Sequence, residues 1–335
     1  MNPFRRVVPG LALLLAVGLV ARLLTESVPA INHLIAAIVL GAVATNTVGI
    51  PPVAAPGVAR HKLLLEVGIV LMGAKLAIDA VLGAGPTILL LVVLTVSFSL
   101  LLVEFLARNV FGLAEKIGSL VAAGASICGV SAVVAVASGI DADEEQIAYA
   151  VAAILLFDAV TLFLYPAIGG LLGLSDVVFG IWAGLSMFST GPVAAAGFAY
   201  SDTAGQWATL TKLARNLLIS AAVVLYSVYY ARKRATQIGD TNRLSTMLLW
   251  EKFPKFIVGF AAVMLLANLG VFSEAQQASL QNAYQWLFLF AFAGLGLDMD
   301  LAKLRYAGTR PVALTFVSLA IVSTTTLVVA HVLFA

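Results

Sequence analysis

The chain has 335 residues, of which 61% are hydrophobic and only 11% are charged. Soluble domains average roughly 45–50% apolar and about 25% charged residues, so this composition excludes a water-soluble protein. The 19 Lys and Arg nearly cancel the 17 Asp and Glu, so net charge does not indicate a nucleic-acid partner. A single cysteine, Cys128, excludes an internal disulfide, and three scattered histidines do not suggest a metal site.

Long apolar runs recur along the whole chain and predict an all-α polytopic membrane protein. A membrane helix needs about 20 mainly apolar residues, because only then do its backbone hydrogen bonds close across the hydrocarbon core. Eleven segments meet this test, at residues 7–24, 31–49, 63–82, 86–107, 118–137, 147–172, 177–198, 213–230, 256–269, 283–297 and 311–334. We expect one transporter domain over residues 1–335, with an extra first helix at 7–24.

Basic residues fix the expected orientation, because short loops rich in Lys and Arg stay on the cytoplasmic side. With the N-terminus inside, most Lys and Arg fall in cytoplasmic loops, above all in the stretch 232–255. The C-terminus is then outside. The first segment also resembles a signal peptide, whose removal would leave ten spans in the same orientation.

Two repeat registers are open. A weak match at an offset of 223 pairs Gly73 and Gly85 with Gly296 and Gly308, so the third span resembles the tenth and would have the opposite orientation. A chance coincidence of Gly and Leu residues is the alternative. A five-helix repeat would instead divide the chain into about 31–172 and 177–334. Either register predicts an inverted-repeat transporter.

The fifth span is rich in small and hydroxyl residues, and it contains the sequence GASICGVSA at 124–132. Glycine weakens a helix and lets a ligand approach the backbone, so this span is expected to be discontinuous near the middle of the membrane. We expect its substrate-binding residues to be Gly124, Ser126, Cys128, Gly129 and Ser131. Close packing between helices is the alternative explanation of the small residues.

Two further polar segments are candidates for the substrate site. The seventh span is interrupted before Pro192, where Ser189 and Thr190 offer hydroxyl groups, and a proline kink without a ligand is the alternative. Asn46, near the end of the second span, needs a hydrogen-bond partner, either in the protein or on a substrate.

Asp158 is the carboxylate nearest the centre of a predicted span, where an isolated charge costs several kcal/mol. It is expected to couple transport to H⁺ or Na⁺, or to pair with Lys75, the cation well inside the third span.

Lys212 and Arg215 begin the eighth span. They would either attract an anion or extend to lipid headgroups.

The chain carries no nucleotide-binding or hydrolase motif, which argues against ATP-driven transport and against an enzyme. We expect no cofactor apart from a coupling ion.

The segment 124–132 resembles the signature of the YeiH family. Members of this family are described as sulfate exporters, but their substrates are largely uncharacterised. Supporting similarity lies at 41–46, 65–76, 164–166 and 212–216. The resemblance implies a fold related to the bile acid/sodium symporter group, with two discontinuous helices crossing near the midplane. One departure is notable: many relatives carry His, Glu and Gln where this chain has Phe188, Ser189 and Pro192, so Asp158 is expected to be a relocated carboxylate.

The sequence therefore predicts a secondary transporter of the cytoplasmic membrane that moves a small anion of the sulfate, organosulfonate or carboxylate class. Transport is expected to be coupled to an ion, and the resemblance implies export as its direction. The expected partners are the anion, the lipid bilayer and a second copy in a homodimer, and no nucleic acid. A proton or sodium antiporter using Asp158 and a channel are the alternatives.

Overall fold

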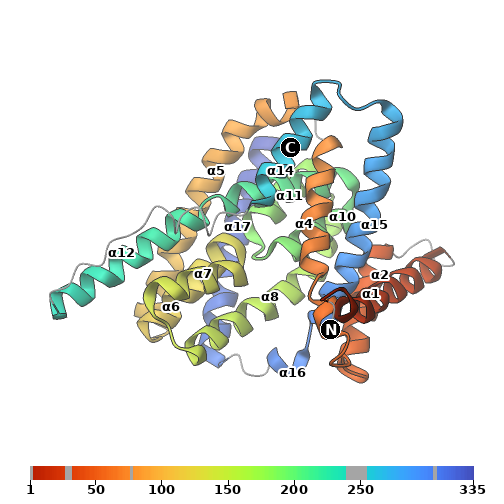
Figure 1. Cartoon of the computed structure of the whole chain (residues 1–335). Coiled ribbons are helices and arrows are strands. Elements are labelled where there is room, and N and C mark those ends of the chain that lie inside the picture. The colour runs from red at the N-terminus through yellow and green to blue at the C-terminus, as the bar shows by residue number, and fades with distance from the viewer. Residues whose placement is uncertain (1–2, 27–31, 76–77, 239–254, 305–307) are drawn as a thin grey trace. The chain divides into compact units, whose positions relative to one another are not determined.

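The computed structural model describes residues 3–26, 32–75, 78–238, 255–304 and 308–335, and within these ranges every regular element is a helix (Figure 1). The all-α prediction is confirmed. The chain forms two compact units, Met1–Gly85 with Lys255–Ala302, and Pro86–Pro254 with Lys303–Ala335. Each of the predicted halves, 31–172 and 177–334, contributes to both units, and the repeat boundary between them stays a prediction.

Within the described residues, the first unit is built mainly from helices of two separate parts of the chain. They are α1 (Pro3–Glu26), α2 (His33–Thr47), α3 (Ala55–Val58), α4 (His61–Met72), η1 (Gly73–Lys75), α14 (Phe256–Asn268), α15 (Glu274–Asp298) and the start of α16 (Leu301–Leu304). Helix α15 packs on both α2 and α4. Gly68 contacts Phe288 and His61 contacts Gly294, so α4 and α15 run in opposite directions.

The offset of 223 residues has a structural counterpart in this unit. Helices α2 and α14 begin at residues 33 and 256, which are 223 apart. A Cβ atom on Gly73 would lie 2.7 Å from the carbonyl oxygen of Phe260 in α14, and one on Gly296 would overlap that of Ile38 in α2. Since Gly73 and Gly296 are also 223 apart, each glycine lets the backbone of its partner helix approach in the same way.

The second unit contains most of α5 and the remaining helices. They are α5 (Ile78–Phe105), η2 (Leu106–Val110), α6 (Glu115–Ala123), η3 (Gly124–Cys128), α7 (Val130–Ile140), α8 (Glu144–Leu171), α9 (Asp176–Ser186), α10 (Thr190–Tyr200), α11 (Asp202–Asn216), α12 (Ile219–Ile238) and α17 (Thr309–Phe334). Side-chain caps fix several helix starts, as where the Asp143 carboxylate accepts from the Gln146 N–H. Helix α8 packs against α6, α7 and α10.

The fifth predicted span is a helical hairpin. Its first arm, α6 with η3, turns at Gly129 and returns as α7, and α6 and α7 pack side by side. The ammonium of Lys116 at the start of the hairpin donates to the carbonyl of Asp141 at its end. Helix α7 has 11 residues and spans about 16 Å, half of a hydrocarbon core. The predicted interruption is present, but it is a reversal of the chain and not a break within a crossing helix.

The seventh predicted span is a second hairpin, built from α9 and α10. The ring of Phe179, near the start of α9, stacks on that of Tyr200, at the end of α10, with 4.0 Å between centroids. The Tyr200 hydroxyl also donates to the carbonyl of Leu174 at 2.6 Å. Both arms have 11 residues, so this segment too is expected to return to the side of the membrane from which it enters.

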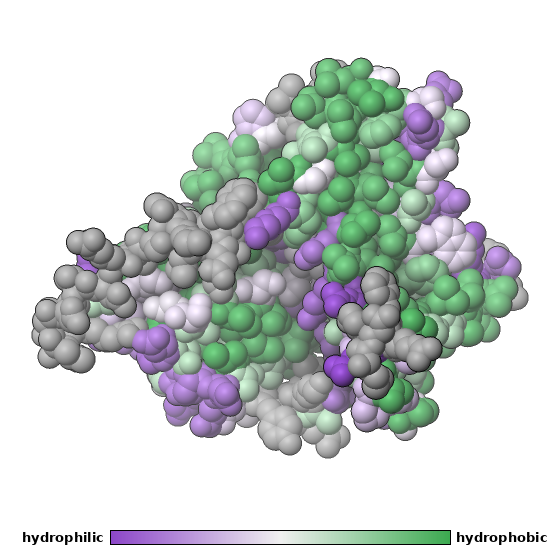
Figure 2. Space-filling view, viewed as in Figure 1, coloured by the Kyte–Doolittle hydropathy of each residue, from purple (hydrophilic) through white to green (hydrophobic). Residues whose placement is uncertain are grey.

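Five described helices are long and apolar enough to cross a membrane, namely Arg6–Glu26, Ala84–Val110, Glu144–Leu171, Asp202–Lys233 and Thr309–Phe334. Large apolar side chains remain exposed on them, including Leu101 at 73% and Leu225 at 66%. Figure 2 shows apolar residues over broad parts of the visible surface. Such surfaces are expected where lipid is the solvent.

Candidate functional site

The tips of the two hairpins meet inside the second unit. Gly129 at the first tip has a φ of +68°, a conformation that favours glycine. A Cβ atom there would lie 3.2 Å from the Cα of Ser189 at the second tip and would overlap its hydroxyl oxygen. The two reversals of the chain are therefore in direct contact.

Asp158 lies at this junction, in the middle of α8, and is only 3% exposed. Its carboxylate accepts a hydrogen bond from the backbone N–H of Ser189 at 3.0 Å and another from the Ser189 hydroxyl. Ser189 is the N-cap of α10, so a negative charge stands at the N-terminus of that helix, where the helix dipole favours it.

Lys212 and Arg215 lie on the other side of the tips, near the end of α11. The Lys212 ammonium donates to the carbonyls of Ile127 and Met187, at 2.8 and 3.0 Å. The Arg215 guanidinium donates to the carbonyls of Gly184, Met187 and Ala125. The two side chains are 0% and 1% exposed, so neither extends to lipid headgroups. The carbonyls at the ends of the first arms hold them inside the unit.

The second arm of each hairpin begins without a side-chain cap. Gly129 precedes α7 and Ser189 precedes α10, and neither N-cap residue accepts with its side chain from the N–H groups that follow it. Val130, Thr190 and Gly191 are half-buried, and Ser131 is exposed. Two helix N-termini with accessible N–H groups therefore lie next to the contact between the tips.

Asn216 lies next to the start of α10. Its amide nitrogen donates to the Thr190 hydroxyl at 3.1 Å, and its side chain is 4% exposed. Its amide oxygen and the Arg215 Nε are buried atoms with no hydrogen-bond partner within the described part of the chain. Buried polar atoms without a hydrogen-bond partner call for an explanation, and a small polar ligand near the N-terminus of α10 would supply the missing partners.

The remaining predicted residues of the first hairpin lie behind its tip. Ser126 is fully buried and donates to the Ser99 hydroxyl of α5 at 2.8 Å, so it joins the hairpin to a neighbouring helix. Gly124 lies against Val133 and Ile154, and Cys128 is buried. These three positions shape the hairpin, whereas Gly129 lies at the contact between the tips and Ser131 is exposed at the start of α7.

Asn46 and Lys75 belong to the first unit. The Asn46 amide donates to the Ala42 and Met299 carbonyls and accepts from the Leu301 N–H, so its partners lie in the protein. Lys75 ends η1 and is exposed. The hydrogen bonds of Asp158 come from Ser189, and the pairing with Lys75 stays a prediction.

The first arms of the two hairpins share a short sequence repeat that the count of spans does not use. Ala123, Gly124 and Ser126 recur 60 residues later as Ala183, Gly184 and Ser186. The two sets occupy equivalent places, in the last turns of the two first arms. Helix α8, which follows the first hairpin, packs on α10 of the second, and α12, which follows the second hairpin after α11, packs on α7 of the first.

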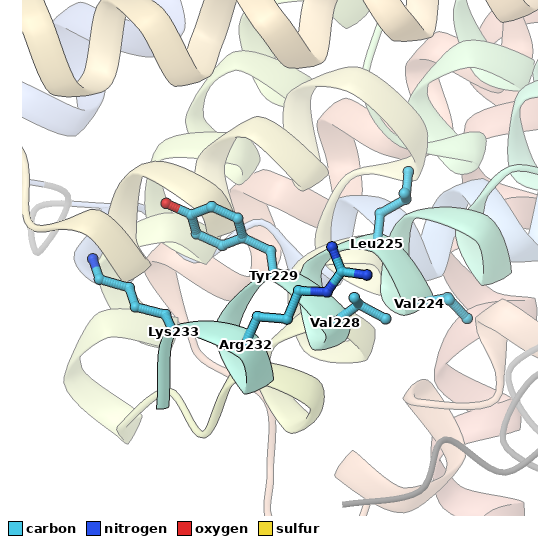
Figure 3. A pocket seen from close by; sticks show the side chains of 6 residues that line it. All are labelled: Val224, Leu225, Val228, Tyr229, Arg232 and Lys233. Carbon is cyan, nitrogen blue, oxygen red and sulfur yellow. The ribbon is translucent and has the colours of Figure 1, made fainter. Parts of the chain in front are cut away.

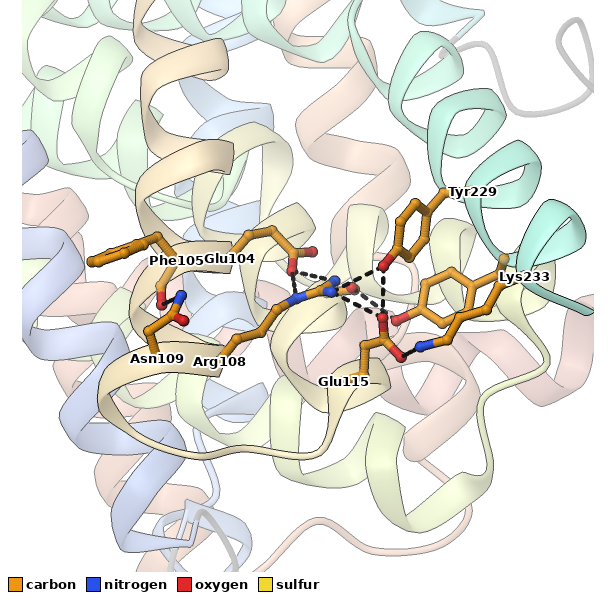
Figure 4. Close-up of polar contacts among 9 residues, drawn as sticks. Glu104, Phe105, Arg108, Asn109, Glu115, Tyr229 and Lys233 are labelled. Atoms are coloured by element: carbon orange, nitrogen blue, oxygen red, sulfur yellow. Dashed lines mark hydrogen bonds and ion pairs between the residues drawn. The ribbon is translucent and has the colours of Figure 1, made fainter.

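An ionic cluster joins the start of the first hairpin to α5 and α12 (Figure 4). The Arg108 guanidinium pairs with Glu104 at 2.8 Å and with Glu115 at 2.9 Å. Lys233 and the Tyr229 hydroxyl also donate to the Glu115 carboxylate. The hydrogen bond from Lys233 is the main cause that lowers the pKa of Glu115 below its usual value.

An open groove of about 600 Å³ follows α12 beside this cluster (Figure 3). Its walls are apolar at one end and basic at the other, formed by Val224, Leu225, Val228, Tyr229, Arg232 and Lys233. It lies on the outer face of α12, and none of the residues at the hairpin tips lines it. The basic residues Arg243 and Lys252 of the stretch 232–255 lie outside the described residues.

Comparisons with known proteins identify the family. The sequence profile of the family described as Conserved hypothetical protein 698 matches residues 9–315. A UPF0324 membrane protein of Nitratidesulfovibrio vulgaris is 31% identical over 90% of this chain and 86% of its own length. The UPF0324 inner membrane protein YeiH of Escherichia coli is 31% identical over 92% of this chain and 89% of its own length. No solved structure matches the chain. The chain therefore belongs to the YeiH family of UPF0324 membrane proteins.

Proposed function

We propose that the chain is a secondary transporter that binds a small anion beside the contact between the hairpin tips. The observation that carries the proposal is the convergence of two uncapped helix N-termini beside two buried cations. Backbone N–H groups at a helix N-terminus point toward a bound anion, and the helix dipole adds to the attraction. Sulfate, sulfonate and carboxylate oxygens are the acceptors that such donors suit.

Charge balance supports an anionic substrate. Lys212 and Arg215 supply two positive charges, and Asp158 supplies one negative charge, all within the same buried region. In a low-dielectric interior one uncompensated positive charge is unfavourable, and an arriving anion neutralises it. The N–H groups of α7 and α10, the Thr190 hydroxyl and the Asn216 amide would fix the orientation of the anion.

Asp158 is the group we assign to ion coupling. Within the described part of the chain, the hydrogen bonds to its carboxylate come from the N–H and the hydroxyl of Ser189, so a change in its charge acts directly on the tip of the second hairpin. Taking up H⁺ or Na⁺ would weaken or reorganise these bonds. Coupling of this kind links the ion gradient to the movement of the substrate.

The hairpins also support alternating access. Since each hairpin returns to the face it came from, and α8 between them is long enough to cross the membrane, the two hairpins would enter from opposite sides and meet near the midplane. With the N-terminus inside, the basic segment 232–255 remains cytoplasmic and the C-terminus remains outside, because replacing two crossings by two hairpins preserves the orientation of the later helices.

The test is uptake of labelled sulfate, and of a panel of sulfonates and small carboxylates, into proteoliposomes with imposed pH or Na⁺ gradients. We expect saturable uptake that Ser131→Trp abolishes, because Ser131 is exposed at the N-terminus of α7. Ser138→Trp is the matched control, since Ser138 is exposed at the far end of the same helix. Uptake that is unaffected by Ser131→Trp, or absent for the whole panel, contradicts the proposal.

A proton or sodium antiporter is the second candidate, and the buried carboxylate of Asp158 is the observation that favours it. Such an antiporter would move H⁺ or Na⁺ without any added anion. The same proteoliposomes with a trapped pH dye distinguish the two candidates, because the anion transporter moves protons only when its substrate is present.

A further inference from the structure

Four backbone carbonyls converge behind the hairpin tips, and they form a site of the kind that binds a cation. Ala125 and Ile127 lie in the last turn of the first arm of one hairpin, and Gly184 and Met187 lie at the corresponding end of the other. Carbonyl oxygens at a helix C-terminus lack an intrahelical partner and carry the negative end of the helix dipole. In transporters with interrupted helices, such carbonyls commonly coordinate Na⁺.

Two side chains of the protein already occupy this position. Lys212 donates to one carbonyl from each hairpin, Ile127 and Met187, and Arg215 donates to Ala125 of the first hairpin and to Gly184 and Met187 of the second. Lys212 and Arg215 are three residues apart on α11, so they lie on the same face of that helix. Each cation therefore bridges both hairpin tips.

We infer that Lys212 and Arg215 are tethered substitutes for a bound metal cation. Their side chains satisfy the converging carbonyls permanently and hold both hairpin tips to α11 as one element. A dissociable Na⁺ at this place would have to displace an ammonium or guanidinium group that is covalently attached and fully buried. The folded protein therefore needs no Na⁺ at its hairpin tips.

In the transport cycle, if the chain has the function proposed above, the two hairpin tips would move together. Since the tips are joined to each other and to α11, opening one hairpin alone would leave several buried carbonyls and a buried cation without partners, which is costly. Access to the anion site would then change by movement of the hairpins together with α11. Na⁺ at the carbonyl cluster would play no part in coupling, which leaves Asp158 as the titrating group.

The experiment removes the tethered cation and supplies a free one. Thermal unfolding of the purified full-length protein is measured in NaCl, methylammonium chloride and choline chloride at equal ionic strength, for wild type and Lys212→Ala. We expect the Tm of wild type to be the same in all three salts. Lys212→Ala should have a lower Tm in choline, and Na⁺ or methylammonium should raise it by about 3 °C or more, because either cation can enter the vacated carbonyl site.

Lys116→Ala is the matched control, because Lys116 also donates to a backbone carbonyl of the first hairpin, at its open end. Its Tm should not respond to the choice of cation. If Lys212→Ala cannot be purified, Lys212→Gln removes the charge but keeps a donor group, and it is compared in the same way.

The inference is overturned if the Lys212 variants respond to cations no more than Lys116→Ala does, or if Na⁺ stabilises the wild type as much as it stabilises the variants. These readouts require no transport assay. A failure to find anion uptake would therefore reject the proposed function and leave the cation result intact, and the reverse also holds.

Discussion

Gly129 and Ser189 are in contact although they are 60 residues apart and lie at the tips of different hairpins. A Cβ atom on Gly129 would overlap the Oγ of Ser189, and Ser189 is at the same time the residue that donates to Asp158. The contact therefore connects the turn of the first hairpin, through the second, to the buried carboxylate of α8. Any change at Gly129 should be transmitted to the group that we assign to coupling.

Gly129→Ala should destabilise the protein by about 2 kcal/mol or more, because an alanine is strained at a φ of +68° and its methyl group overlaps Ser189. The measurement is thermal unfolding of the purified protein. Adding Ser189→Gly to Gly129→Ala should restore part of the loss, since it removes the overlap but not the backbone strain. Gly170→Ala, where the Cβ would meet open space, is the control; an equal loss there would refute the role of the contact.

Asp158→Asn should lower anion uptake roughly tenfold or more and abolish its dependence on the imposed pH or Na⁺ gradient. The amide cannot change its charge, and exchanging a charged acceptor for a neutral one weakens both bonds from Ser189. Ser189→Ala, which leaves the backbone N–H in place, should be milder. Glu144→Gln, at an exposed carboxylate, serves as the control. The assignment fails if Asp158→Asn leaves both the rate and the gradient dependence unchanged.

The membrane class and the positions of the interruptions could be predicted from the sequence, because apolar run length and local clusters of small residues are local properties. The hairpins could not. A run of about 20 apolar residues has the same hydropathy whether it crosses once or turns back at its middle, and the difference lies in the turn at Gly129 and in the packing of α7 on α6.

The environment of Lys212 and Arg215 was equally hidden from the sequence. A basic residue at the end of an apolar run usually extends to the headgroups, and nothing near residues 212–215 indicates otherwise. Their partners lie 25 to 90 residues earlier in the chain and are backbone carbonyls, which carry no sequence signature. Only the meeting of the two tips creates the carbonyl cluster that retains these cations.

The two hairpins predict an unusual topology that cysteine labelling can test in a Cys128→Ser background. Ala114→Cys and Ala142→Cys, at the two ends of the first hairpin, should react with an impermeant maleimide from the same side of the membrane. Leu172→Cys, beyond α8, should react from the opposite side. If the fifth span crossed the membrane, Ala142→Cys would change sides relative to Ala114→Cys, and Leu172→Cys would join Ala114→Cys.

Glu115 should make stability depend on pH at the open end of the first hairpin. Its pKa is lowered below 4.5, mainly by the hydrogen bond from Lys233, so the folded state favours the ionised form. The stabilisation is therefore present at neutral pH, well above the unfolded value, and is lost as the pH falls through the lowered pKa of the folded state.

Glu115→Gln should accordingly reduce stability at pH 7 by at most about 1 kcal/mol, because Lys233 is half-exposed and solvent screens the pair. The deficit relative to wild type should shrink as the pH falls below about 4.5, where the wild-type carboxylate takes up its proton and loses the same interactions. Thermal unfolding of both proteins from pH 7 to pH 3.5 measures this convergence, with Glu144→Gln as an exposed control. A deficit that stayed constant over this range would mean that the glutamine acts through packing, and that the charge of Glu115 contributes nothing to holding the hairpin against α12.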